Sequence, residues 1–259
     1  MCIILFAFDC HPDYKFICAA NRDEYYSRPT REASFWENKN ILAGKDLVRG
    51  GTWLGITRSG RFAALTNYRD PSAFMTDALS RGLLVLSCLE SSEPAPAIIR
   101  RVSKDDGAYN GYNLLLGDMD GLYYHSNRLP GSEVHIEPGV HGLSNSLLDV
   151  PWPKVEKGKK RLEDCVLSGN IEPEALFNIL SDDEPAPDEE LPHTGVSYRW
   201  EKILSSIFVK SEDYGTCSST VLLVGRDGRV RFWERSYEPA SGRVRGNLFF
   251  EFNIEPAAV

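Results

Sequence analysis

The sequence predicts an α+β protein in which two β-sheets are layered with helices. β-prone apolar stretches come first, amphipathic helical stretches follow in the middle, and β-prone stretches return towards the end. Hydrophobic residues make up 42% of the 259 residues and charged residues 25%, which is typical of a chain that buries a core. Because no repeat or break in composition divides the chain, we predict one domain over residues 1–259.

The first half of the chain is predicted to form hairpins. Residues 2–8 and 15–20 are apolar and flank a turn at 11–13, which predicts an opening hairpin. Similar patterns predict hairpins over 52–68 and 112–126. Short strands are expected at 134–136 and 140–144.

Helices are predicted where apolar residues recur every three or four positions. These stretches are 76–89, 95–102, 154–167 and 172–180. The chain returns to β-prone segments at 206–209, 218–224, 230–234 and 248–252. Asp227-Gly228 is predicted to turn the middle pair.

Charge and composition exclude several classes of protein. Acidic residues outnumber basic ones by 37 to 29, which argues against a nucleic-acid binder. No apolar run reaches the roughly 18 residues of a membrane-spanning helix. The first residues lack the basic region and cleavage site of a signal peptide, so we expect a soluble, cytoplasmic protein with reduced cysteines. The six cysteines form no C-x-x-C and no Cys/His cluster, so no metal and no cofactor are predicted.

Cys2 is the residue with the most distinctive chemistry. Removal of Met1, which is expected when the second residue is small, gives Cys2 both a thiol and a free α-amino group. The pKa of such an amine is about 7.7–8.0, so it can act as the base for its own thiol. This arrangement is that of an N-terminal nucleophile. The alternative is a small apolar residue that begins a buried strand.

The predicted opening hairpin places Cys2 opposite Arg22. The second strand then ends in the polar run Asn21-Arg22-Asp23-Glu24. We expect Asp23 to hold the α-amino group, and Arg22 or Asn21 to lower the thiol pKa or bind an acidic group of a substrate. The alternative for this run is a solvated strand end before a turn.

A set of motifs resembles a known family. In chain order they are Met1-Cys2, Ala20-Asn21-Arg22-Asp23-Glu24, Gly50-Gly51-Thr52-Trp53-Leu54-Gly55, Leu65-Thr66-Asn67-Tyr68-Arg69, His141-Gly142-Leu143-Ser144-Asn145-Ser146 and Tyr214-Gly215-Thr216. Together they resemble the NRDE family, which includes the transport and Golgi organization protein 2 proteins. The resemblance spans nearly the whole chain. It implies a four-layer αββα sandwich of the N-terminal-nucleophile (Ntn) hydrolase type, distantly related to choloylglycine hydrolases and penicillin acylases.

The resemblance also implies roles for two asparagines. Asn67 and Asn145 match asparagines of those hydrolases, where an amide can stabilise the oxyanion of a tetrahedral intermediate. The alternative for each is a turn or strand-end residue that satisfies backbone groups. Those hydrolases also have an arginine and an aspartate after the second strand, but with a spacing that differs from the adjacent Arg22-Asp23 of this chain. The resemblance therefore implies a site role for Asp23 more strongly than for Arg22.

The remaining candidates are for ligand binding. They are Asn21, His141 near Asn145, and Arg199, which loosely matches a late arginine of those hydrolases. A partly buried strand histidine is the alternative for His141. Where the NRDE family commonly has Arg after Tyr-Gly-Thr, this chain has Cys217, so an interaction of that arginine is lost or altered here.

Two functions stay open at this point. The first is an Ntn-type cysteine amidohydrolase or acyltransferase acting on a linear carbon–nitrogen amide bond, with Cys2 as nucleophile, Asp23 orienting its amine, and Asn145 and Asn67 stabilising the oxyanion. The second is a non-catalytic carrier or chaperone for haem, a lipid or acyl-CoA in the same cleft. The expected partner is therefore a small-molecule amide, a lipid-like molecule or haem. The family is associated with secretory organisation, lipid or acyl-CoA metabolism and haem trafficking, and it supplies neither a substrate nor an oligomeric state.

Overall fold

Two antiparallel β-sheets pack face to face at the centre of the structure, a computed structural model that describes residues 2–129, 131 and 133–255. Sheet A contains, in order across the sheet, β10 (Gly139–Leu143), β1 (Cys2–Phe8), β2 (Tyr14–Tyr25), β11 (Tyr214–Gly225), β12 (Arg229–Tyr237) and β13 (Val244–Asn253). Sheet B contains β3 (Thr30–Phe35), β4 (Ile41–Asp46), β5 (Leu54–Thr57), β6 (Phe62–Asn67), β7 (Tyr112–Gly117), β8 (Leu122–Ser126) and β9 (Val134–His135).

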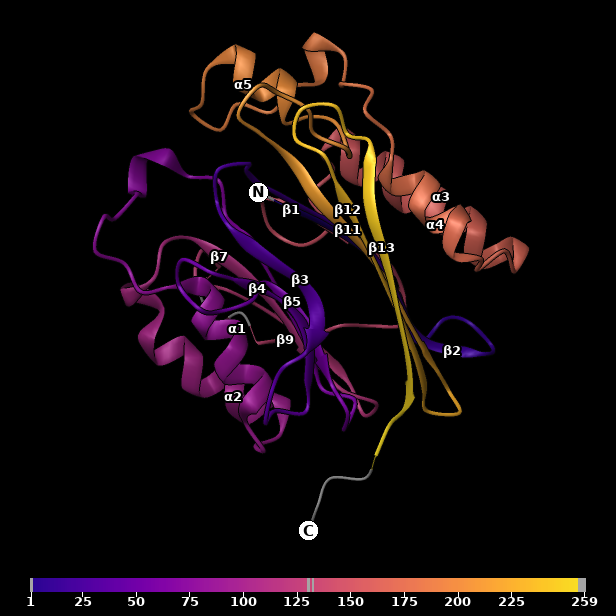
Figure 1. The fold of residues 1–259 in the computed structure, drawn as a ribbon. Coiled ribbons are helices and arrows are strands. Elements are labelled where there is room, and N and C mark those ends of the chain that lie inside the picture. The colour runs from indigo at the N-terminus through magenta and orange to yellow at the C-terminus, as the bar shows by residue number, and fades with distance from the viewer. Residues whose placement is uncertain (1, 130, 132, 256–259) are drawn as a thin grey trace.

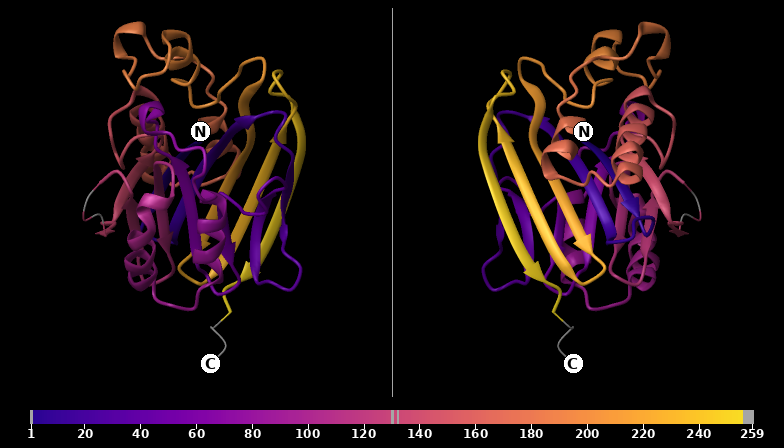
Figure 2. Two further views of the ribbon diagram at one scale, coloured as in Figure 1. Left: turned by 90° about the vertical axis from the view of Figure 1, so that its left-hand side faces the viewer. Right: turned by 90° about the vertical axis from the view of Figure 1, so that its right-hand side faces the viewer.

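Helices cover the outer face of each sheet (Figures 1 and 2). Sheet B is covered by α1 (Arg81–Glu90) and α2 (Ala95–Val102), and sheet A by α3 (Pro153–Ser168) and α4 (Pro173–Leu180). The short α5 (Tyr198–Ile203) lies at the end of the molecule where β1 begins. The layers confirm the predicted αββα sandwich. Within the described ranges, no helix is long and apolar enough to cross a bilayer.

β1 is buried on both of its faces, which explains its continuous apolar sequence. Its even-numbered side chains enter the core between the two sheets, and its odd-numbered ones enter the core between sheet A and the helices α3 and α4. The two sets are Ile4, Phe6 and Phe8, and Ile3, Leu5 and Ala7. Cys2 belongs to the even-numbered set and therefore starts the strand on the side between the sheets.

The opening hairpin has the predicted register, with Cys2 opposite Arg22 and Phe8 opposite Phe16. β1 also pairs with β10, where Ile4 lies opposite Leu143. Beyond that pair, the hydroxyl of Ser144 donates to the carbonyl oxygen of Cys2 at 3.2 Å. The start of β1 is thus flanked by the end of β2 on one side and by the residues after β10 on the other.

The structure differs from the predicted elements in several places, and one of them is α5, which was not predicted. β3 and β4 were not predicted; half of β3 is exposed, and it shows no apolar pattern. Residues 206–209 were predicted as a strand, but they are loop residues whose chain is held by a hydrogen bond from the Phe208 amide to the Asp182 carbonyl. α1 begins at Arg81 instead of 76, and the segment before it contacts the loop ahead of β7, where the Leu79 amide donates to the Ala108 carbonyl.

Candidate functional site

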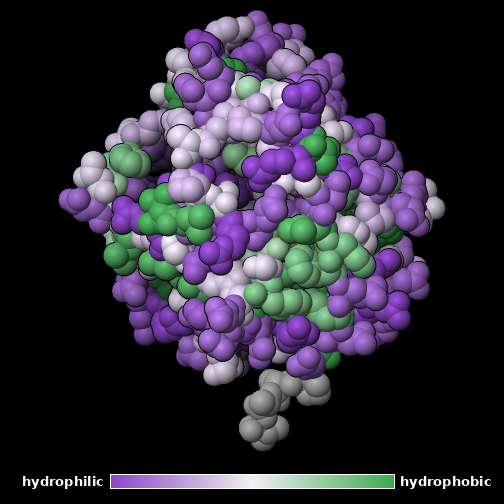
Figure 3. Space-filling model, in the orientation of Figure 1, coloured by the Kyte–Doolittle hydropathy of each residue, from purple (hydrophilic) through white to green (hydrophobic). Residues whose placement is uncertain are grey.

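A cavity of about 190 Å³ opens between the sheets at the end where β1 begins. Its lining includes Cys2 and Arg22 from sheet A, Gly44 from β4, Asn67 from the end of β6 and Arg81 from α1. Figure 3 shows that hydrophilic residues dominate this end of the molecule and that the surface is hollowed close to where Figure 1 marks the N-terminus. The site is therefore a polar cleft built by both sheets.

A row of four side chains forms the floor of this cavity. Cys2 lies opposite Arg22, Arg22 opposite Ser218, and Ser218 opposite Ser236, so the row crosses β1, β2, β11 and β12. All four residues line the cavity. Neighbouring strands are about 4.8 Å apart, so the row is about 14 Å long. A ligand on this floor would lie across the strands, with Cys2 at one end.

Cys2 is 7% exposed and contributes to the cavity wall. Burial raises the pKa of its thiol, and the nearby charge of Arg22 offsets only part of that increase. Arg22 lowers the thiol pKa as expected, but burial outweighs it, because sequence neighbours do not report how much water reaches the sulfur. The resting thiol is protonated at neutral pH, and its use as a nucleophile requires a base.

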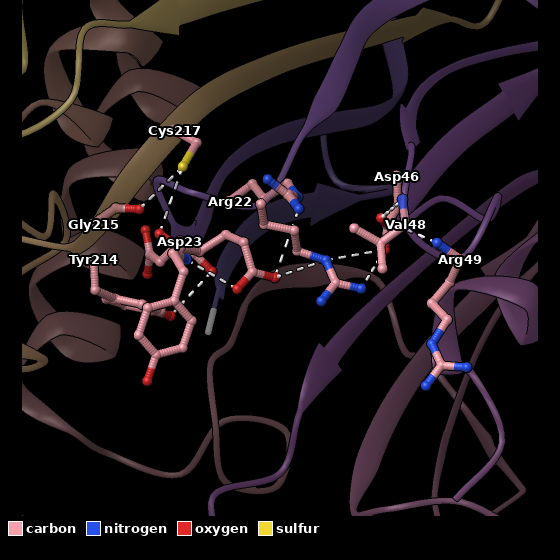
Figure 4. Close-up of polar contacts among 11 residues, drawn as sticks. Arg22, Asp23, Asp46, Val48, Arg49, Tyr214, Gly215 and Cys217 are labelled. Atoms are coloured by element: carbon pink, nitrogen blue, oxygen red, sulfur yellow. Dashed lines mark hydrogen bonds and ion pairs between the residues drawn. The ribbon is translucent and has the colours of Figure 1, made fainter.

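Asp23 is buried beside Cys2 and is held by the Tyr-Gly-Thr motif of β11 (Figure 4). The Thr216 hydroxyl donates to Asp23 Oδ1 at 2.7 Å, and the Tyr214 hydroxyl donates to the Asp23 backbone carbonyl at 3.0 Å. Burial raises the pKa of Asp23, while the positive charge of Lys154 lowers it. A Cβ atom at Gly215 would lie 2.5 Å from the backbone carbonyl oxygen of Val209, so glycine is required between the two donors.

A β-bulge at Cys217 lies beside Arg22 and Asp23, both of which line the cavity. Asp23 pairs with Thr216 and Arg22 with Ser218, which leaves Cys217 as the extra residue. The bulge relaxes the usual alternation of side chains in β11, at the point where this strand passes Arg22 and Asp23. Cys217 itself lines the cavity, and burial raises its pKa to about 11. The position where the family commonly has Arg is thus part of this site.

The two asparagines occupy different places. Asn145 is 1% exposed, and its Nδ2 donates to the backbone carbonyl of Asn67 at 2.9 Å. Asn67 is half-buried and lines the cavity, and its side chain makes no hydrogen bond to any other described residue. Asn67 therefore lies at the cavity, whereas Asn145 holds its backbone carbonyl.

Arg81 was not singled out by the sequence, where it only opens an amphipathic pattern. It is the first residue of α1, lines the cavity, and its Nη1 donates to the Gly111 carbonyl at 2.7 Å. Burial lowers the pKa of Arg81, and the nearby Cys2 opposes that change. The Gly50-Gly51 motif allows this placement, because a Cβ atom at Gly51 would lie 2.3 Å from the backbone carbon of Gly82.

Two further buried charged groups also escaped the sequence analysis. Lys154 lies behind Asp23, donates from Nζ to the Leu204 carbonyl at 2.9 Å, and has its pKa lowered to about 8 by burial. Glu234, from β12, lines the cavity, accepts from the Ala33 amide at 2.6 Å, and has its pKa raised to about 7 by burial. Neither residue belongs to a recognisable motif: Lys154 is a single lysine after two prolines, and Glu234 is a single glutamate in a strand of alternating pattern.

Three predicted ligand-binding residues do not line this cavity. Asn21 faces the helix layer, where its Nδ2 donates to the Leu180 and Ile207 carbonyls. His141 bonds to Asp149 and stacks on Phe6, and Arg199 is exposed on α5. The part of the chain that the structure describes also holds no cluster of three or more His, Cys, Asp or Glu side chains suited to a metal ion.

Comparisons with known proteins extend this picture. The family model described as Transport and Golgi organisation 2 matches residues 1–239. The chain is 42% identical over 258 residues to the Transport and Golgi organization protein 2 homolog of Bos taurus, covering 91% of this chain and 93% of that protein. It is 38% identical over 257 residues to the homolog of Homo sapiens, with the same coverage.

A solved structure shows the same fold. The Caenorhabditis elegans N-acylethanolamine-hydrolyzing acid amidase ortholog aligns with a TM-score of 0.51 and 12% identity. The alignment covers 85% of this chain and 92% of that chain. At this identity the likeness concerns the fold alone, and it confirms the predicted Ntn-hydrolase type.

Proposed function

The chain belongs to the Transport and Golgi organisation 2 family, and from its Ntn-type fold and its cavity we propose that it hydrolyses, or transfers the acyl group of, a linear carbon–nitrogen amide bond. The observation that carries the proposal is the position of Cys2. It begins β1 inside the cavity, directly opposite Arg22 and beside the buried Asp23. The names of the relatives give a family and no reaction, so the chemistry is argued from these residues.

The first step is attack by the Cys2 sulfur. After removal of Met1, the α-amine of Cys2 takes the thiol proton, and the sulfur adds to the amide carbonyl carbon. The π electrons of the carbonyl move to its oxygen. Asp23 is the nearby carboxylate suited to orient the ammonium that forms. Because burial keeps the resting thiol neutral, an adjacent base is what this reaction requires.

The second step breaks the carbon–nitrogen bond. The Asn67 amide faces the cavity and donates to the oxyanion of the tetrahedral intermediate. As the intermediate collapses, the amine leaves with the proton held by the α-amino group and Cys2 retains the acyl group as a thioester. Water, deprotonated by the same amine, then releases the acid, or an acceptor amine takes the acyl group.

The size of the cavity favours this reaction over a carrier function. Pockets that enclose a drug-sized ligand measure about 300–1,000 Å³. A cavity of about 190 Å³ accommodates the reacting end of a molecule but does not enclose haem or a whole lipid. A carrier for haem, a lipid or acyl-CoA stays the second candidate from the sequence.

The test compares wild type, Cys2→Ala and Cys2→Ser on a panel of N-acyl amides that vary in acyl length and amine, with the released amine measured. Wild type should turn over at least one class of amide, and Cys2→Ala should not. Cys10→Ala, which alters an exposed cysteine, is the matched control and should retain activity. Turnover by Cys2→Ala at the wild-type rate would rule out the nucleophile. Equal binding of haem or a fatty acid by wild type and Cys2→Ala, with no hydrolysis by either, would favour the carrier.

A further inference from the structure

Arg81 brings a positive charge to the cavity wall that the proposed reaction does not use. Two other arginines of the cavity are already neutralised, Arg28 by Asp46 at 2.6 Å and Arg245 by Glu32 at 3.1 Å. Among the described residues no carboxylate lies within 4 Å of the Arg81 guanidinium, whose bond to Gly111 engages a backbone carbonyl. Such a partly buried cation is stabilised by an anion that enters from outside.

Arg22 adds a second guanidinium on the other side of Cys2. It lies directly opposite Cys2 in sheet A, whereas Arg81 approaches from the helix layer of sheet B. The pairing of Arg22 with Glu24 is long, at 3.6 Å. The first turn of α1 contains no acidic residue, and the carboxylate of the cavity wall that acts on Arg81 is that of Glu24. The two arginines thus approach the reactive sulfur from different layers of the sandwich.

We infer that Arg81, together with Arg22, binds a carboxylate or phosphate group of the ligand next to the atom that Cys2 attacks. A guanidinium presents parallel N–H donors that match either anion, and such charge-assisted bonds are strong in a partly buried site. The inference deepens the proposed function, on which it rests for the reaction at Cys2. It narrows the substrate to an amide that carries an anionic group close to the bond that breaks.

The test uses two small alkylating reagents that differ in charge. Iodoacetate is anionic and iodoacetamide is neutral, and both react with the thiolate of Cys2. The ratio of their rate constants at Cys2, measured by peptide mapping, cancels any change in the thiol pKa. The variants are Arg81→Gln and, as a matched control, Arg245→Gln, whose arginine lines the same cavity but is paired with Glu32.

The iodoacetate-to-iodoacetamide ratio should be about tenfold or more higher in wild type than in Arg81→Gln, since a hydrogen bond to a charged group contributes that much. Arg245→Gln should keep the wild-type ratio. An unchanged iodoacetamide rate in Arg81→Gln would show that the cavity is intact. Equal ratios in wild type and Arg81→Gln, or failure of both reagents to reach Cys2, would overturn the anion site.

Competition separates the two possible anions. The competitors are inorganic phosphate and acetate, and the measured quantity is the rate at which iodoacetate alkylates Cys2. Stronger inhibition by phosphate would assign a phosphate group to the ligand. Stronger inhibition by acetate would assign a carboxylate. Protection by neither anion would count against the site. The anion site and the amidase activity can fail separately. If the protein prefers iodoacetate to iodoacetamide but hydrolyses no amide, the anion site stands and the proposed amidase activity is refuted.

Discussion

Asn145 donates from its side-chain amide to the backbone carbonyl of Asn67, at 2.9 Å, and so separates the roles of two residues that the sequence placed together. The Asn145 amide is used within the protein, while Asn67 lines the cavity. In the proposed reaction we therefore assign oxyanion stabilisation to Asn67, and to Asn145 the positioning of the Asn67 backbone.

The first prediction follows from that division. Asn145→Ala removes a buried hydrogen bond and should lower the free energy of unfolding by about 1–3 kcal/mol. Asn67→Ala should change it by no more than about 0.5 kcal/mol, yet lower kcat for an amide substrate by about a hundredfold or more. Urea denaturation and steady-state kinetics measure the two effects. A larger loss of stability in Asn67→Ala than in Asn145→Ala would contradict the assignment.

The second prediction concerns the buried ion pair between Arg69 and Glu201. Their side chains are 3% and 5% exposed and 2.8 Å apart, and the pair joins the end of β6 to α5. Glu201→Ala leaves a buried guanidinium without this carboxylate and should cost about 3–5 kcal/mol of unfolding free energy. Arg100→Ala breaks an exposed ion pair with Glu133 and should cost less than about 1 kcal/mol. If Glu201→Ala and Arg100→Ala lower the free energy of unfolding by similar amounts, the buried ion pair does not stabilise the fold as predicted.

The third prediction concerns Glu234 and pH. Burial raises its pKa from 4.5 to about 7, so the folded state binds the proton more tightly than the unfolded state. The contribution of Glu234 to the free energy of unfolding is therefore full below about pH 4.5 and is lost as pH rises towards 7. Glu32 and Arg22 also act on this carboxyl, in opposite directions. Glu234→Gln removes the titration.

Denaturant unfolding at pH 5 and pH 7.5 tests this dependence. The stability of wild type relative to Glu234→Gln should be greater at pH 5 than at pH 7.5. Because other groups titrate in both proteins, only this difference reports Glu234. A difference that stays constant between the two pH values would show that Glu234 has an ordinary pKa.

The local parts of the fold could be predicted from the sequence. The opening hairpin, the hairpin over 112–126 and the helix over 95–102 depend on neighbouring residues, and their turns and periodicity are visible in the chain. The pairing of Cys2 with Arg22 follows from the symmetry of a single turn. Elements that depend on neighbouring residues could thus be predicted from the sequence, and so could the pairing of Cys2 with Arg22 at the site.

The rest depends on contacts between distant segments. Arg81 and Glu234 reach the cavity from α1 and β12, and nothing near them in the sequence points to Cys2. The bulge at Cys217 depends on how β11 meets β2. The raised pKa of Cys2 reflects burial by several layers of structure. Such features require the assembled fold.

The mass of the N-terminal peptide, determined on preparations of known amidase activity, tests the role of Cys2 most directly. Preparations with different amounts of retained Met1 can be obtained by inhibiting methionine aminopeptidase in the expression host. If Cys2 works with its own amine as base, activity should rise in proportion to the fraction of chains that begin at Cys2. Full activity in a preparation that retains Met1 would contradict the N-terminal-nucleophile mechanism.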